Sequence, residues 1–285
     1  MGNQDPQSSA TSISGDESPQ DLARDAKPPS QTPARSSCSK SWAYLNQPIR
    51  PSLFVEMQLL LLTFSVGLQD AISFYDFNCF ASNQTGNTVL LVISAVLPEM
   101  NGHLFDTPNT GVALGFFLGA AYLTGQIANI LSCGRNRLFL VICNLLQTLL
   151  VFGAAIMQYT NGVNRANSHT LLAIGMLAAA AGSQVVQSRS FKMTEISTAM
   201  ATAAWVDLLV DKNLFKRENR ARNRRAGFLV TLALGTLVGG FVFKKVGSPA
   251  ALVISGAGKG LVTLLWLFAE GEREEKGDEE KGQGA

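Results

Sequence analysis

A short polar run, N-Q-T-G-N-T at residues 83 to 88, interrupts a chain that is apolar on both sides of it. Its amide and hydroxyl side chains can donate and accept hydrogen bonds, and Gly86 can adopt a positive φ where a helix breaks. Irregular backbone is costly in hydrocarbon unless it lines a cavity. We therefore expect this run to break a helix and to offer polar groups to a solute.

A carboxylate, Asp70, lies 15 positions before Thr85 in another apolar stretch. An ionised carboxylate in a bilayer costs at least about 2.5 kcal/mol and usually marks a pathway or an ion pair. One hypothesis is that Asp70, Thr85 and Asn87 act together on a solute or a coupling proton, which requires the chain to reverse near residues 77 to 79. The structural alternatives are an interfacial Asp70 and a buried pair with Lys259.

No set of residues typical of an enzyme or a metal site is present. His103 and His169 fall at or near loops, and neither a nucleophile elbow nor a phosphate loop occurs. The four cysteines form no C-x-x-C pair, so we expect apolar thiols rather than zinc ligands or disulfides. The sequence predicts no enzyme, no cofactor and no metal.

The segments that must position these residues are strongly apolar. Charged residues are 15% of the chain and apolar residues 47%, and the charges gather in two tails and one loop. A crossing of the bilayer needs about 20 apolar residues. The windows that meet this length are 53 to 74, 79 to 97, 111 to 131, 138 to 158, 169 to 188, 226 to 243 and 250 to 268. A less apolar window lies at 193 to 210.

Basic residues predict the topology. The loop 211 to 225 holds seven Lys or Arg against two acids, which predicts a cytoplasmic location, whereas 98 to 110 has no Lys or Arg and is expected on the opposite side with 159 to 168. The turn 133 to 137, with two arginines, is also expected inside. Both basic loops can lie on the cytoplasmic side only if one apolar window between them enters the membrane and returns to the same side. The net charge of +2 excludes a nucleic-acid partner.

The window that turns back is expected to be 193 to 210, which contains Glu195 and Asp207, and 79 to 97 is its counterpart in the first half. Six full crossings then remain. The first half starts outward and the second inward, so the two halves are expected to be inverted. Lys244 and Lys245 fall on the outer side in this scheme.

An internal repeat supports the same division. G-L-Q at 67 to 69 is similar to G-S-Q at 182 to 184, and T-G-N at 85 to 87 aligns with T-A-M at 198 to 200. L-G-x-x-x-G recurs at 114 to 119 and 234 to 239. The glycines predict close helix packing, with these two helices crossing at the centre of the fold.

The predicted fold class is an all-α polytopic membrane protein with six transmembrane helices, two re-entrant or broken segments and an inverted 3+3 repeat. The domains are a disordered tail at 1 to 52, a transmembrane domain at 53 to 269 and a charged tail at 270 to 285. Its halves are 53 to 158 and 169 to 268. The two broken segments are expected to meet near the midplane.

The expected substrate-binding residues are the polar ones at the breaks and at the matching G-x-Q positions. They are Gln69, Asp70, Asn83, Thr85, Gly86, Asn87, Gln184, Ser197 and Thr198.

The run G-x-x-D-A-x-S-F at 67 to 74, the T-G-N-T at 85 to 88 and the two L-G-x-x-x-G segments resemble the YoaK-type family of small integral membrane proteins. That domain-of-unknown-function family occurs in bacteria and fungi, and the long polar tails here resemble fungal members. The likeness covers roughly residues 55 to 268. Where the family has a second Thr-Gly step, this chain has Thr198-Ala199. The resemblance implies a membrane protein without a settled biochemical role.

The sequence favours a transporter or channel for a small solute. The alternatives are a membrane scaffold or regulator that acts through its tails and polybasic loop, and a membrane enzyme. Expected partners are the lipid bilayer, an unknown solute and anionic lipid at 211 to 225. A homo-oligomer stays open, as does the identity of the membrane that this multi-pass protein occupies.

Overall fold

The computed structural model describes residues 37–163 and 167–272, and most of this part of the chain is α-helix. The tails predicted at 1 to 36 and 273 to 285 lie outside the described residues. The helices are α1 (Ser37–Leu45), α2 (Leu53–Phe77), α3 (Gln84–Val96), α4 (Thr107–Ile130), α5 (Arg137–Asn161), α6 (Ser168–Arg189), α7 (Ala201–Leu209), α8 (Arg220–Val246) and α9 (Ser248–Leu265), with 3-10 turns η2 (Pro98–Met100) and η3 (Trp266–Phe268).

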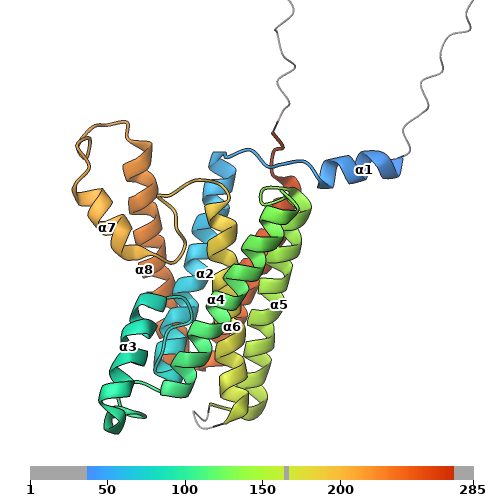
Figure 1. Cartoon of the computed structure of the whole chain (residues 1–285). Helices are drawn as coiled ribbons and strands as arrows, with labels where there is room; N and C mark the ends of the chain where they lie inside the picture. The colour runs from blue at the N-terminus through green and yellow to red at the C-terminus, as the bar shows by residue number, and fades with distance from the viewer. Residues whose placement is uncertain (1–36, 164–166, 273–285) are drawn as a thin grey trace, which may run out of the picture.

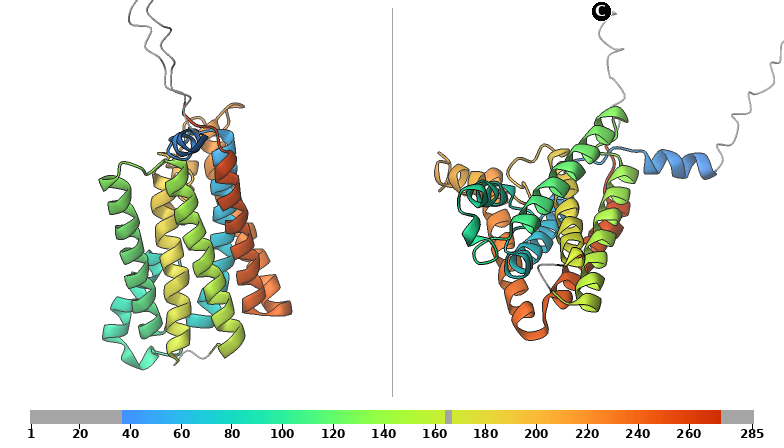
Figure 2. Two further views of the ribbon diagram at one scale, coloured as in Figure 1. Left: turned by 90° about the vertical axis from the view of Figure 1, so that its right-hand side faces the viewer. Right: turned by 60° about the horizontal axis from the view of Figure 1, so that its bottom comes forward.

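Six of the described helices are long and apolar enough to cross a membrane: α2, α4, α5, α6, α8, and α9 together with η3. Figures 1 and 2 show them side by side in one bundle. The lengths and composition are those of a multi-pass membrane protein, as predicted. The windows 79 to 97 and 193 to 210 contain only α3, with 13 residues, and α7, with 9. Both are too short to cross, since a crossing needs about 20 residues.

The chain reverses directly after α2, where the sequence required a turn. Asn78 takes a left-handed conformation with φ 52°, and its backbone N–H donates to the Phe74 carbonyl. The Asn109 amide donates to the Phe77 carbonyl at 3.2 Å, which fixes the start of α4 beside the end of α2. Asn83 then begins α3 by accepting a hydrogen bond from the Gly86 N–H. The expected reversal near residues 77 to 79 is confirmed.

The connections divide between the two ends of the bundle (Figure 1). The α4–α5 turn, the α7–α8 loop and α1 lie at one end. The α3–α4 connection, the end of α5 and the α8–α9 turn lie at the other. Basic-residue counts assigned these loops to opposite sides in the same way, and Lys244 and Lys245 fall at the second end.

The ordered part of the chain begins before residue 53. Ile49 is fully buried, and its N–H donates to the Arg135 carbonyl at 2.9 Å. The Arg50 N–H donates to the Glu270 carbonyl at 3.0 Å. Because this segment buries an apolar side chain and pairs its backbone, the tail boundary expected at residue 52 is wrong for residues 37 to 52. Residues 270 to 272 pair their backbone with this segment, since the Glu272 N–H donates to the Pro48 carbonyl at 2.8 Å.

The helices pack in matching pairs. α2 packs chiefly on α8, α6 packs chiefly on α4, and α5 packs about equally on α9 and α6. Each short helix packs on the long helix that follows it, α3 on α4 and α7 on α8. α2 and α6 run in opposite directions through the bundle (Figure 1).

Glycines allow the closest of these approaches. A Cβ on Gly235 would lie 2.3 Å from the Phe64 carbonyl oxygen, and one on Gly182 would lie 2.3 Å from that of Phe117. Gly115 and Gly119, by contrast, have no described neighbour within 4 Å of such a Cβ. A Cβ on Gly239 would lie 3.0 Å from the Leu68 Cα, so the expected packing is right for Gly235 and Gly239 and wrong for the α4 pair. The expected crossing of α4 with α8 is also wrong, because these helices pack chiefly on α6 and α2.

Candidate functional site

A group of buried polar side chains lies where α2, α5, α6 and α9 meet. We call it the polar centre, and its members are Gln69, Asn144, Gln147, Gln184, Gln187, Ser255, Lys259 and Thr263. All are fully buried except Thr263, which is 7% exposed. Lys259 lies one residue from the middle of the 21-residue span Ser248–Phe268. The polar centre therefore lies deep within the apolar bundle.

The Lys259 ammonium donates to two side-chain amide oxygens, Gln184 Oε1 and, at 3.5 Å, Gln147 Oε1. Each of these amides is held by its own NH₂ group. Gln184 Nε2 donates to the Leu62 carbonyl at 3.3 Å, and Gln147 Nε2 donates to Gln187 Oε1 at 3.1 Å. Because the NH₂ groups are bound elsewhere, the carbonyl oxygens stay turned toward the ammonium.

Further hydrogen bonds connect α2 and α5 to α9. Gln69 Nε2 donates to Ser255 Oγ at 2.8 Å, and that hydroxyl donates to the Ser65 carbonyl at 2.9 Å. Asn144 Nδ2 donates to the Lys259 carbonyl at 2.7 Å and to Thr263 Oγ1 at 2.8 Å. Gln69 Oε1 and Asn144 Oδ1 have no partner among the described residues. Two acceptors in the polar centre therefore remain available to a ligand or water.

Lys259 has no acidic partner in the part of the chain that the structure describes, since none of the ion pairs there includes it. The hypothesis of a pair with Asp70 is wrong. Asp70 accepts hydrogen bonds from the N–H of Ser82, at 2.9 Å, and from its hydroxyl. Asp70 follows Gln69 directly, and one residue turns the side chain by about 100° around a helix. Gln69 thus faces the polar centre while Asp70 faces the chain reversal.

The chain reversal at residues 78 to 83 is held from both sides. Asp70 binds Ser82, and Ser73 Oγ accepts from the Ala81 N–H at 3.0 Å. Asn87, in α3, accepts from the Phe80 N–H at 2.9 Å and donates to the Phe80 carbonyl at 2.7 Å. These polar groups are engaged in shaping the loop, whereas Thr85 and Asn83 are exposed.

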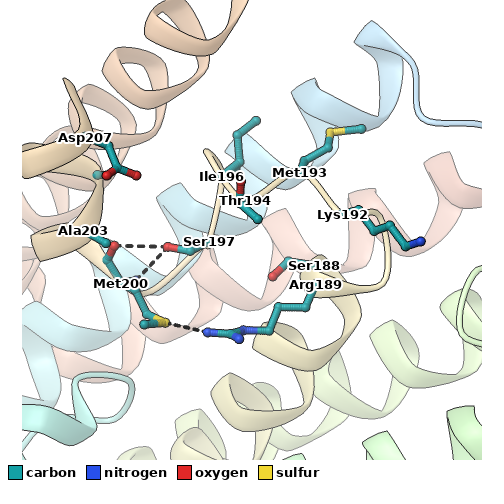
Figure 3. A pocket seen from close by; sticks show the side chains of 11 residues that line it. Ser188, Arg189, Lys192, Met193, Thr194, Ile196, Ser197, Met200, Ala203 and Asp207 are labelled. Carbon is teal, nitrogen blue, oxygen red and sulfur yellow. Dashed lines mark hydrogen bonds between the residues drawn. The ribbon is translucent and has the colours of Figure 1, made fainter. Parts of the chain in front are cut away.

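The second break forms a pocket of ≈ 400 Å³ between the end of α6 and α7 (Figure 3). Ser197 lines it and accepts from the Met200 N–H at 3.1 Å. Arg189 and Lys192 also line it, and the Arg189 guanidinium contacts Met200 Sδ at 3.0 Å. The adjacent Thr198 is fully buried with φ 59°, and its hydroxyl has no partner among the described residues.

Basic residues at the start of α8 fasten this second break to the bundle. Arg224 pairs with Glu56 of α2 at 2.6 Å and with Glu195 at 3.5 Å. Arg225 lies 3.8 Å from Asp207 and 3.5 Å from Asp211. Glu195 and Asp207, the two acids that lower the hydropathy of the window 193 to 210, therefore form ion pairs with arginines of α8. The Asn219 amide donates to Asp211 and holds the pKa of that carboxyl below its usual range.

The expected site residues separate into three places. Gln69 and Gln184 lie in the polar centre, and Asp70 contacts the reversal. Asn83, Thr85, Gly86 and Asn87 lie at the start of α3, and Ser197 and Thr198 lie beside the pocket. Figures 1 and 2 place α3 and α7 on the same flank of the bundle. The close approach of their starting residues stays a prediction.

Sequence reasoning missed Gln147, Asn144 and Ser255, and it gave Lys259 the wrong partner. A usable signal was present in the spacing of the amides. Asn144 and Gln147, like Gln184 and Gln187, are three positions apart in apolar segments. That spacing puts each pair on one helical face, where a buried polar contact is needed.

Comparison with protein families matches residues 58–265 to the family described as "Protein of unknown function (DUF1275)". No match was found among curated proteins or among solved structures. The family match spans most of the chain and all six long helices in whole or in part. The chain therefore belongs to this family, in agreement with the resemblance that its motifs showed.

Proposed function

We propose that this protein transports a small solute, which binds at the polar centre. The observation that carries the proposal is Lys259, a fully buried lysine at mid-span that contacts amides and has no acidic partner among the described residues. Ionisable residues in membrane-spanning helices are costly and usually mark a substrate or ion pathway. A purely structural bundle would gain more from apolar packing at this position.

An inverted repeat is part of this proposal. The order α2, α3, α4, α5 would correspond to α6, α7, α8, α9, and the packing of α3 on α4 and of α7 on α8 supports it. Gln69 and Gln184 occupy matching positions in this scheme, and both lie in the polar centre. Transporters built from inverted repeats bind solute between their halves, beside broken helices.

The pocket at the α6–α7 break supports an access route from one end of the bundle. Its lining includes Ser197, and Thr198 next to it has an unpartnered buried hydroxyl. Under this proposal the starts of α3 and α7 line the path between the ends of the bundle and the polar centre. Alternating access would then move the short helices relative to the long ones.

The test uses the full chain, purified and screened by thermal unfolding against sugars, amino acids, nucleosides, carboxylates and inorganic ions. Any solute that stabilises the protein is then followed as a labelled tracer into liposomes. We expect uptake by the wild type and by Lys244→Met, a control at the exposed end of α8, and none by Lys259→Met. Absence of any stabilising solute and of any uptake would contradict transport.

The scaffold alternative makes a different prediction for the tails. Removing residues 1 to 36 and 273 to 285 should leave uptake unchanged if the protein is a transporter. A scaffold would instead lose its cellular effect on tail removal, while Lys259→Met would leave that effect intact.

Contact with anionic lipid at 211 to 225 is a separate part of the proposal. Four arginines of this loop are engaged within the chain, because Arg220, Arg224 and Arg225 form ion pairs and Arg222 donates to the Leu214 and Lys216 carbonyls. Lys212, Lys216 and Arg217 remain exposed beside Phe215, which is 95% exposed. An apolar side chain among cations suits a surface of anionic lipid.

A further inference from the structure

We infer that the solute is a small anion, of the size of an inorganic ion or a short carboxylate, and that Lys259 is its charge partner. This inference rests on the proposed transport function and names the chemical class of the solute. It follows from three features: the orientation of the amides around Lys259, the missing counter-charge, and the charges at the pocket.

The amides around Lys259 present acceptors to its side-chain nitrogen. Both side-chain groups that it contacts are oxygens, which accept hydrogen bonds and cannot donate them. Turning either amide to offer its NH₂ group would break the bond of Gln184 to the Leu62 carbonyl or that of Gln147 to Gln187. The polar centre therefore holds the Lys259 nitrogen as a hydrogen-bond donor, a role that the amine fills with two N–H groups and the ammonium with three.

When Lys259 is protonated, its ammonium has no counter-charge among the described residues and one N–H group without an acceptor there. It carries three N–H groups, and the described residues supply acceptors for two of them. Buried charges are normally paired, because amide dipoles alone replace only part of the lost hydration. An anion bound at Lys259 would supply the missing charge and accept the third N–H. A cationic solute would instead be repelled.

The pocket at the α6–α7 break carries positive charge as well. Arg189 and Lys192 line it, and neither has an acidic partner within ion-pair distance among the described residues. The acid in the lining, Asp207, is 3.8 Å from Arg225. Figure 3 shows Arg189 and Lys192 at one side of the pocket, with Asp207 at the opposite side. Cationic walls raise the local concentration of anions.

The test measures thermal unfolding and transport current of the full chain in phosphatidylcholine liposomes, which contain no anionic lipid. The probes are chloride, nitrate, sulfate, phosphate and acetate in a gluconate background, with glycerol and methylammonium as neutral and cationic comparisons. The variants are Lys259→Met, the control Lys244→Met, and Gln184→Glu. The last keeps an oxygen near the ammonium and supplies an internal counter-charge.

We expect at least one anion to stabilise the wild type and Lys244→Met and to produce current. The apparent affinity should fall about tenfold or more in Lys259→Met and in Gln184→Glu, a change of about 1.4 kcal/mol or more. If Lys259→Met fails to fold, Gln184→Glu decides alone.

An anion response that survives in the folded variants would overturn the inference. A response to glycerol or methylammonium alone would also overturn it, while leaving the transport proposal standing. No response to any probe or to the wider solute panel would end both proposals.

Discussion

Asp70 and Lys259 are charged residues in long apolar helices, Asp70 half-buried and Lys259 fully buried, and their surroundings differ. Asp70 is bound by the backbone and hydroxyl of Ser82, only 12 residues away, in the loop that reverses the chain. Lys259 is bound by amides of α5 and α6, 112 and 75 residues away. A charge satisfied by a nearby loop shapes that loop. A charge held between helices, without a counter-charge among the described residues, is available to a ligand.

The largest expected effect on stability is at Asp70. Replacing it with alanine removes both hydrogen bonds to Ser82, and bonds to a charged group contribute about 1.5 to 3 kcal/mol each. We expect Asp70→Ala to lower the free energy of unfolding by about 3 kcal/mol, measured by denaturant or thermal unfolding. A double-mutant cycle with Ser82→Ala should show strong coupling. Independent effects of the two substitutions would remove the structural role assigned to Asp70.

Asn87 should show the next largest effect. Its side chain holds the backbone of Phe80 through two hydrogen bonds, so Asn87→Ala should cost about 2 kcal/mol of stability. Thr85→Val, two positions away on the exposed surface, should change stability by less than about 0.5 kcal/mol. Thermal unfolding of both variants compares them directly. Equal losses would mean that the break is held differently from the arrangement described above.

Ser255 tests the weaker connections of the polar centre. Ser255→Ala removes the acceptor for Gln69 Nε2 and the donor to the Ser65 carbonyl. We expect a loss of about 1 kcal/mol, because neutral hydrogen bonds contribute about 0.5 to 1.5 kcal/mol each. The adjacent variant Gly256→Ala is not a usable control, because its Cβ would lie 3.0 Å from the Phe152 ring. Ser94→Ala is better suited, because the half-buried Ser94 hydroxyl donates to the Leu91 carbonyl of its own helix and contacts no other helix through a hydrogen bond among the described residues.

Among the substitutions that remove buried hydrogen bonds, the smallest expected change in stability is at Lys259. Lys259→Met leaves two amide oxygens without a donor, which lowers stability. It also replaces a buried ionisable group with an apolar side chain of similar length, which raises stability, so the two effects oppose each other. We expect the free energy of unfolding to change by less than about 1 kcal/mol. A loss as large as that of Asp70→Ala would show that Lys259 is structural and would weaken the contrast between the two charges.

The sequence predicted the long helices well, because spanning a bilayer imposes a length and an apolar composition that can be read directly. It also predicted the reversal after Phe77, since Asp70 and the polar run could converge in no other way. It could not predict which loop residue Asp70 binds, because Ser82 depends on the local backbone. The partners of Lys259 depend on how α5, α6 and α9 pack, and no local pattern encodes that packing.

The glycine motifs show a different limit. L-G-x-x-x-G occurs in both α4 and α8, but Gly235 contacts α2 while Gly115 and Gly119 contact no described neighbour. Small residues are frequent in membrane helices. An L-G-x-x-x-G segment therefore does not by itself indicate which glycines face a neighbouring helix. The packing face was therefore assigned correctly in one helix and wrongly in the other.

The most direct test of the account is the transport current of the full chain in phosphatidylcholine liposomes, compared between wild type, Lys259→Met and Lys244→Met. We expect an anion-dependent current in the wild type and in Lys244→Met, and its loss in a folded Lys259→Met. A current of equal size in all three proteins would contradict the claim that Lys259 is the charge partner of the solute.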